Sequence, residues 1–166
     1  MPPVIYIMGV SGSGKTTIGQ MLAAQTALPF FDADDFHPAA NKEKMKSGIA
    51  LTDDDRIPWL QNLHQVATDQ NKIKGAIIAC SALKEKYRSI LTNGIAQPAF
   101  IFLQGTYESI LNRVEKRSGH FMPPQLLQSQ FDSLEIPFHA FTVDIEQEPG
   151  KITQLILQYL NNNNII

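Results

Sequence analysis

Near the N-terminus, glycines, hydroxyl side chains and one lysine stand at a spacing suited to chemistry beside an anion. Positions 9–16 read Gly-Val-Ser-Gly-Ser-Gly-Lys-Thr and match G-x-x-x-x-G-K-[ST] at every fixed position. In such a loop, backbone N–H groups surround phosphates, the lysine reaches the outer phosphates, and the threonine hydroxyl reaches their Mg²⁺. The sequence therefore predicts a nucleoside triphosphate site. Its predicted members are Gly9, Val10, Ser11, Gly12, Ser13, Gly14, Lys15, Thr16 and Thr17.

A second group of reactive side chains is acidic and lies in the segment Asp32-Ala33-Asp34-Asp35-Phe36-His37. Two carboxylates at positions i and i+2 of a turn can divide the work of phosphoryl transfer. One faces a metal ion or its water shell, and the other faces an acceptor hydroxyl. We therefore predict catalytic roles for Lys15, Asp32 and Asp34. The residue types alone allow the two aspartates to exchange their roles.

The chain also carries more cationic side chains than a triphosphate needs. Arg56, Lys84 and Arg88 form one set, and arginine is suited to bidentate binding of a carboxylate. Arg113 and Arg117 precede a segment with one glycine and two prolines, which is typical of a connection that closes over the γ-phosphate. The sequence thus predicts a mobile lid at about residues 113–130 and favours a small-molecule kinase over a GTPase switch or an ATPase.

Composition limits the partners and the location. The chain has 166 residues and a mass of 18.5 kDa, so we expect a single domain over residues 1–166. Fourteen Lys and Arg against 16 Asp and Glu leave a net charge of −2, which argues against nucleic acid or an acidic membrane as a partner. One cysteine, no signal-peptide pattern and no apolar run of about 20 residues indicate a cytoplasmic protein with small-molecule partners.

The elements that must position these residues follow an alternating pattern. Short apolar runs at 4–8, 28–31, 75–80, 99–103 and 141–145 alternate with amphipathic stretches, which predicts an α/β fold with a parallel sheet flanked by helices in three layers. The phosphate-binding loop then lies between the first strand and a helix N-terminus, where an anion is favoured. The acidic segment follows the second strand, so both groups should meet at one edge of the sheet.

With these motifs in order, the chain resembles the gluconokinase family of small P-loop kinases, which is related in fold to shikimate and adenylate kinases. The family's GVSGSGK stands at 9–15, and its acidic turn with His-Pro stands at 32–38. Its N-x-x-K-M element is at 41–45 and its LTDDDRxPWL hallmark at 51–60. Two further family segments are at 80–88 and 119–132, so the resemblance runs from about Val4 to Asp144.

The resemblance implies a reaction and a role for each matching residue. The expected reaction converts ATP and D-gluconate to ADP and 6-phosphogluconate, with a divalent metal such as Mg²⁺, in a cytoplasmic enzyme that is commonly a homodimer. Thr16 and Asp32 would hold the metal, and Asp34 would orient the sugar hydroxyl. The other residues implied are Arg113 and Arg117 for ATP, Arg56 with Lys84 or Arg88 for the carboxylate, and His37, Ser81 and Gln130 for the polyol hydroxyls.

Two alternatives stay open on the sequence alone. A kinase of another small hydroxy acid, such as shikimate, would use the same loop, acidic residues and arginine. A nucleotide-dependent switch would bind ATP and act through its shape, without any pocket for a polyol. Formation of ADP that depends on an added sugar acid distinguishes an enzyme from such a switch.

Overall fold

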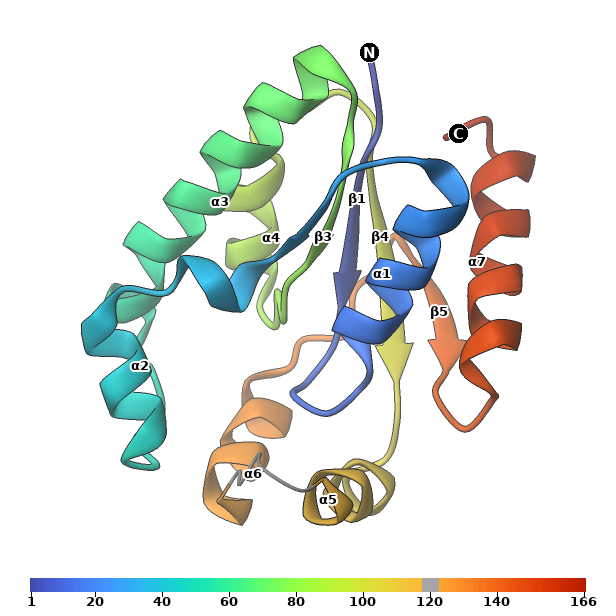
Figure 1. Cartoon of the computed structure of the whole chain (residues 1–166). Helices are drawn as coiled ribbons and strands as arrows, with labels where there is room; N and C mark the ends of the chain where they lie inside the picture. The colour runs from blue at the N-terminus through green and yellow to red at the C-terminus, as the bar shows by residue number, and fades with distance from the viewer. Residues whose placement is uncertain (118–122) are drawn as a thin grey trace.

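A parallel sheet of five strands forms the centre of the molecule (Figure 1). The computed structural model describes residues 1–117 and 123–166. The strands are β1 (Val4–Met8), β2 (Phe30–Asp32), β3 (Ala76–Ala79), β4 (Pro98–Gln104) and β5 (Ala140–Asp144). Their order across the sheet is β2-β3-β1-β4-β5, and every neighbouring pair is parallel. The predicted α/β fold with a parallel sheet is therefore confirmed.

Helices cover both faces of this sheet and make it the middle of three layers (Figure 1). On one face lie α1 (Lys15–Thr26) and α7 (Pro149–Asn162), and on the other lie α3 (Asp53–Ile73) and α4 (Glu85–Thr92). Successive residues of β1 face opposite layers, because side chains alternate along a strand. All five residues of β1 are fully buried. The phosphate-binding loop therefore starts from a strand that is buried along its whole length.

The remaining elements gather at the carboxyl ends of the strands (Figure 1). They are the 3₁₀ helix η1 (Ala33–Phe36) and the helices α2 (Ala39–Lys46), α5 (Tyr107–Lys116) and α6 (Pro124–Ser133). In β2, Asp32 pairs with Ala79 of β3, and Ile7 of β1 pairs with Ala79 from the other side. This register brings the ends of β1, β2 and β3 level with one another, as the sequence pattern predicts for an open parallel sheet.

Part of the predicted lid lies outside the described residues, namely residues 118–122. The rest of the segment 113–130 belongs to the end of α5 and most of α6. The lid thus stays a prediction.

In the described ranges, no helix combines the length and apolar composition needed to cross a membrane.

Gly19 offers a test of how α1 packs on the sheet. A Cβ added at Gly19 would stand 2.4 Å from Cε2 of Phe30. We expect Gly19→Ala to lower the free energy of unfolding by about 1–2 kcal/mol, because overpacking outweighs the helix preference of alanine. Gly150→Ala in α7 is the matched control, because a Cβ there meets nothing within 4 Å. Urea unfolding that finds Gly19→Ala as stable as Gly150→Ala would contradict this packing.

Candidate active site

The phosphate-binding loop has the backbone conformation that its glycines allow. Gly9 has φ of 147°, and a Cβ there would stand 2.8 Å from the carbonyl oxygen of Leu103. Gly14 precedes α1 with φ of 98°, in a region that side chains disfavour. Lys15 begins the helix, and its Nζ donates to the carbonyl oxygen of Val10 at 3.0 Å. The loop is thus wrapped around its own lysine at the N-terminus of α1, where the helix dipole favours an anion.

Two side chains complete the surroundings of this loop. The amide of Ser11 donates to Oε1 of Gln130 at 2.7 Å, so a residue of α6 covers one loop amide. The hydroxyl of Ser13 is buried and has no hydrogen-bond partner in the described part of the chain. A buried hydroxyl without a partner is costly unless a ligand or water satisfies it. The unpartnered hydroxyl of Ser13 fits a loop that receives an anion with many acceptor oxygens.

The acidic turn is joined to the loop through Asp32. One carboxylate oxygen of Asp32 accepts from the hydroxyl of Thr16 at 2.6 Å, and the other accepts from the amide of Asp34 at 3.0 Å. A hydroxyl and a carboxylate in contact are hard oxygen donors of the kind that Mg²⁺ prefers when substrate phosphates and water complete its coordination. The donor set of Thr16 and Asp32 therefore fits a metal carried by a triphosphate. Groups of three or more His, Cys, Asp or Glu at metal-binding distance are absent from the described ranges.

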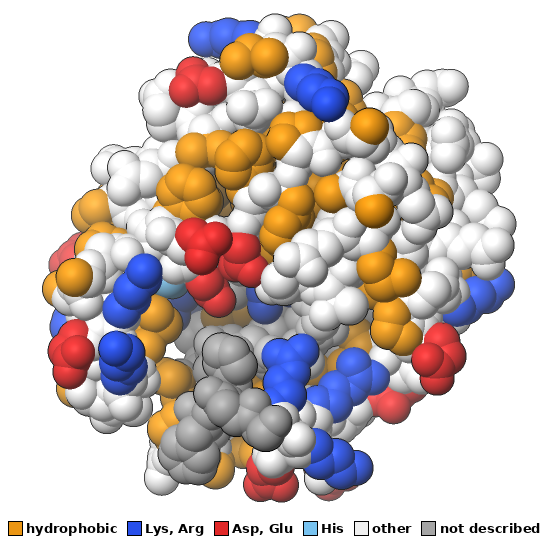
Figure 2. Space-filling model, viewed as in Figure 1, with side chains coloured by type: hydrophobic (Ala, Val, Ile, Leu, Met, Phe, Trp, Pro, Cys, Tyr) orange, Lys and Arg blue, Asp and Glu red, His pale blue; other side chains and the backbone are white. Residues whose placement is uncertain are grey.

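A cavity of about 390 Å³ adjoins the loop and holds most of the predicted substrate-binding residues. In Figure 2, acidic side chains gather near η1 at the upper margin of a hollow that basic side chains flank. Burial lowers the pKa of Lys15, and the carboxylate of Asp34 opposes that shift. The charges of Lys15 and Asp34 thus attract each other across this space. The predicted residues that line it are Ser11, Lys15, Asp34, His37, Arg56, Ser81 and Gln130.

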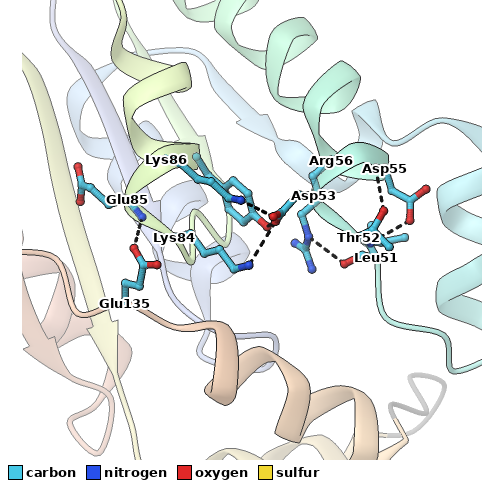
Figure 3. A network of polar contacts seen from close by, with 10 residues as sticks. Leu51, Thr52, Asp53, Asp55, Arg56, Lys84, Glu85, Lys86 and Glu135 are labelled. Carbon is cyan, nitrogen blue, oxygen red and sulfur yellow. Dashed lines mark hydrogen bonds and ion pairs between the residues drawn. The ribbon is translucent and has the colours of Figure 1, made fainter.

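Arg56 is held in this cavity by a residue just before α3 and by a residue of α4. Its Nε donates to the carbonyl oxygen of Leu51 at 3.5 Å, and its guanidinium lies 5.6 Å from the centre of the Tyr87 ring. The hydroxyl of Tyr87 in turn donates to Asp53 (Figure 3 shows Asp53, Arg56 and Leu51). A guanidinium held on one side by a carbonyl and an aromatic face is oriented for a planar anion on its other side.

Two predicted substrate residues do not line the cavity. Lys84 pairs with Asp53 at 3.2 Å (Figure 3). Lys86 pairs with the other carboxylate oxygen of Asp53. Arg88 is 3% exposed, and it donates to the carbonyl oxygens of Ala82 and Leu83 as well as pairing with its helix neighbour Glu85. Lys84 therefore joins the start of α4 to α3, and Arg88 joins α4 to the residues just before it. Their contact with the substrate carboxylate stays a prediction.

Two cationic residues of the same cavity were missed by the sequence reasoning. Lys42 and Lys46 lie one helical turn apart on α2 and both line the space beside Asp34. Their spacing of four residues on a short helix was the only available signal, and a solvated helix face gives the same pattern. The cavity is consequently more cationic than Arg56 and Lys15 alone suggest, which suits an anionic occupant.

His37 is buried among these cations. Burial lowers its pKa to about 4, and the charges of Arg56 and Lys42 act in the same direction. At neutral pH its imidazole is thus uncharged and can donate from one nitrogen while accepting at the other. An uncharged ring of this kind suits hydrogen bonds with the hydroxyl groups of a substrate.

A second cavity, of about 460 Å³, lies on the other side of the loop. Thr17, Arg113 and Arg117 line it, together with the segment that follows β5. Arg113 also donates to the carbonyl oxygen of Ile145, which fastens α5 to that segment. The loop thus stands between two cavities, one with Asp34 and Arg56 and one with Arg113 and Arg117. The first is named the acceptor cavity and the second the nucleotide side, after the roles that we propose for them.

The fold and the site together define the class of protein. A family model described as shikimate kinase matches residues 11–158. The shikimate kinase of Aquifex aeolicus, at 19% identity, shares the fold with a TM-score of 0.58 and coverage of 97% of both chains. A phosphate-binding loop, an adjoining acidic turn and an acceptor cavity on this fold are those of a shikimate kinase-like P-loop kinase.

Closer relatives narrow this class to one family. The thermosensitive gluconokinase of Escherichia coli (strain K12) is 50% identical over 153 residues, covering 89% of this chain and 82% of that protein. The gluconokinase of Arabidopsis thaliana is 40% identical over 177 residues, covering 96% and 93%. A gluconokinase crystal structure from Sinorhizobium meliloti 1021 has 39% identity and a TM-score of 0.88, covering 97% and 93%. This chain belongs to the gluconokinase family.

Asp55 supports the cavity by joining α2 to α3, and it gives a test that depends on pH. Its carboxylate pairs with Lys44 at 2.8 Å and accepts from the amide of Thr52 at 2.9 Å. These bonds lower its pKa from 3.8 to about 2, so their stabilising effect is complete above pH 4 and is lost as the pH falls through 2. We expect Asp55→Asn to unfold at lower temperature than wild type at pH 7, with a difference that shrinks below pH 4.

The control for this measurement is Asp54→Asn, one residue earlier on the same helix turn. We expect a smaller change in melting temperature at pH 7 for that variant. A gap between wild type and Asp55→Asn that stays constant from pH 7 to pH 3 would show that the paired carboxylate is not the source of the stability.

Proposed function

We propose that this chain transfers the γ-phosphoryl group of ATP to the terminal 6-hydroxyl of D-gluconate, giving ADP and 6-phospho-D-gluconate. The observation that carries the proposal is that Lys15, Asp34 and Arg56 line one cavity. That cavity offers a cation for the phosphate, a carboxylate for the reacting hydroxyl and a guanidinium for a carboxylate. The two gluconokinase relatives supply the identity of the substrate.

On the nucleotide side, the loop amides and Lys15 would hold the β- and γ-phosphates. Thr16 and Asp32 would hold Mg²⁺, which neutralises phosphate charge when it is bound. Arg113 and Arg117 would approach the nucleotide from the second cavity. For the Lys15 amine to meet a phosphate, its hydrogen bond to the carbonyl of Val10 is exchanged for one to a phosphate oxygen.

On the acceptor side, the hydroxyl oxygen of gluconate attacks the γ-phosphorus while the bond to the β–γ bridging oxygen breaks. Asp34 would orient the hydroxyl and accept its proton, and Arg56 would bind the carboxylate at the other end of the substrate. Lys42 and Lys46 add positive charge along the same wall. His37, Ser81 and Gln130 would bind hydroxyl groups of the polyol chain.

The rest of the proposal rests on the family resemblance. We propose ATP and D-gluconate as the partners, a cytoplasmic location and a homodimeric assembly. We also propose that the lid at about 113–130 closes over the phosphates, since a γ-phosphate open to water is lost to hydrolysis.

The substrate is tested by ADP formation in a coupled assay with gluconate, shikimate or no acceptor. We expect turnover with gluconate that exceeds turnover with shikimate by at least about 100-fold, because an acid with a different shape cannot place both its carboxylate and its hydroxyl. Higher turnover with shikimate than with gluconate would identify shikimate as the substrate. ADP release that no acceptor increases would favour the nucleotide switch.

Arg56→Lys tests how the carboxylate is bound. A lysine keeps the charge but loses the planar fork and its place against Tyr87, so we expect the KM for gluconate to rise about 10-fold or more. The KM for ATP and the melting temperature should stay near those of wild type. Steady-state kinetics with each substrate varied in turn checks this. A rise confined to the KM for ATP would assign Arg56 to the nucleotide.

A further inference from the structure

The ring of His37 is fixed in its plane by an aromatic neighbour. It stacks on Trp59 with ring centres 4.1 Å apart and planes inclined by 17°. Trp59 is 2% exposed, and its indole N–H donates to the carbonyl oxygen of Ala33 at 2.7 Å. His37 itself is 8% exposed. Because the stack fixes the plane of the ring, the remaining choice is which of its two nitrogens carries the proton.

The side-chain amide of Asn41 lies next to one of these two nitrogens and determines its protonation. Asn41 is 4% exposed, and its Nδ2 donates to the backbone carbonyl oxygen of Asp55 at 2.9 Å. A carbonyl oxygen can only accept, so this bond fixes which end of the amide faces Asp55. The same Nδ2 lies 3.5 Å from Nδ1 of His37. A nitrogen that faces an N–H group must accept, so Nδ1 is unprotonated and the proton lies on Nε2.

The other side of the ring faces the proposed catalytic carboxylate. Nε2 of His37 lies 3.9 Å from Oδ1 of Asp34, too far for a good direct hydrogen bond. A single hydroxyl oxygen can lie at hydrogen-bond distance from both atoms. That hydroxyl would accept from Nε2–H and donate its own proton to Asp34. Both side chains line the acceptor cavity, so the shared point is open to a substrate.

We infer that Asn41 is a positioning residue, which holds His37 as the Nε2–H tautomer so that His37 and Asp34 together orient the reacting hydroxyl of the substrate. The inference rests on the proposed function for the identity of that hydroxyl, but the tautomer itself does not depend on any substrate. His37 donates one hydrogen bond to the oxygen, and the proton of the hydroxyl goes to Asp34. A second lone pair of the oxygen then remains for attack on the phosphorus.

The tautomer is tested by ¹⁵N NMR of the ligand-free protein with labelled histidine. The chain has four histidines, and His37→Gln identifies which signals belong to His37. We expect an unprotonated Nδ1 and a protonated Nε2 at pH 7. In Asn41→Asp, a carboxylate replaces the donor, so Nδ1 should become protonated. A wild-type His37 that carries its proton on Nδ1 would overturn the inference without any kinetic measurement.

Kinetics separate positioning from a structural effect. We expect Asn41→Asp to lower kcat by about 100-fold, with the KM for ATP unchanged. Asn41→Leu, which offers neither donor nor acceptor, should show both tautomers and a smaller loss of kcat. The matched control is Asn71→Asp, a change at a 3% exposed asparagine that binds Pro2 and Ala96 outside both cavities.

The results of these experiments separate the positioning role of Asn41 from a structural effect and from failure of the proposed function. If Asn71→Asp lowers kcat of the folded enzyme as much as Asn41→Asp does, burial of a carboxylate explains the loss and the inference is wrong. If kcat falls only in the Asn41 variants while the NMR signals change as expected, the inference holds. If wild type shows the expected tautomer but no turnover that depends on gluconate, the proposed function fails and the tautomer stands.

Discussion

The hydrogen bond from Thr16 to Asp32 is the contact on which the site depends. It joins the first residues of α1 to the end of β2, two segments that the sheet brings level because β1 and β2 both flank β3. The same carboxylate fixes the backbone of Asp34 through its other oxygen. One side chain thus holds the hydroxyl of Thr16 and the backbone of Asp34 in a constant relation, next to the two oxygens that we propose as metal ligands. A shift of either strand end would separate the phosphates from the acceptor.

Charge then decides what each side of the loop can receive. The acceptor cavity combines Asp34 with Lys15, Lys42, Lys46 and Arg56. An anionic substrate would therefore enter a positive field and would still meet the carboxylate that we propose as its proton acceptor. A protonated imidazole in the same place would add a charge that pairs with Asp34 and weakens it as a proton acceptor. Burial of His37 among cations prevents this and leaves an uncharged hydrogen-bonding group.

The sequence predicted the parts of the site that local spacing determines. The loop at 9–16, the acidic turn after β2 and the five strands lie where the motifs and apolar runs indicated. The sequence could not show that Lys84 pairs with Asp53, because Asp53 lies on another helix and the packing of α4 against α3 has no local signal. Asn41 was noticed only as part of a motif. Its role emerges from a contact across the α2–α3 connection, which a linear pattern cannot show.

A crystal structure with gluconate and a non-hydrolysable ATP analogue measures the central relation directly. We expect the terminal hydroxyl oxygen of gluconate within hydrogen-bond distance of both Asp34 and Nε2 of His37, in line with the γ-phosphorus, and the carboxylate on Arg56. Gluconate bound in the reverse direction, with its carboxylate beside Asp32 or its terminal hydroxyl remote from Asp34, would contradict the assignment of the acceptor side.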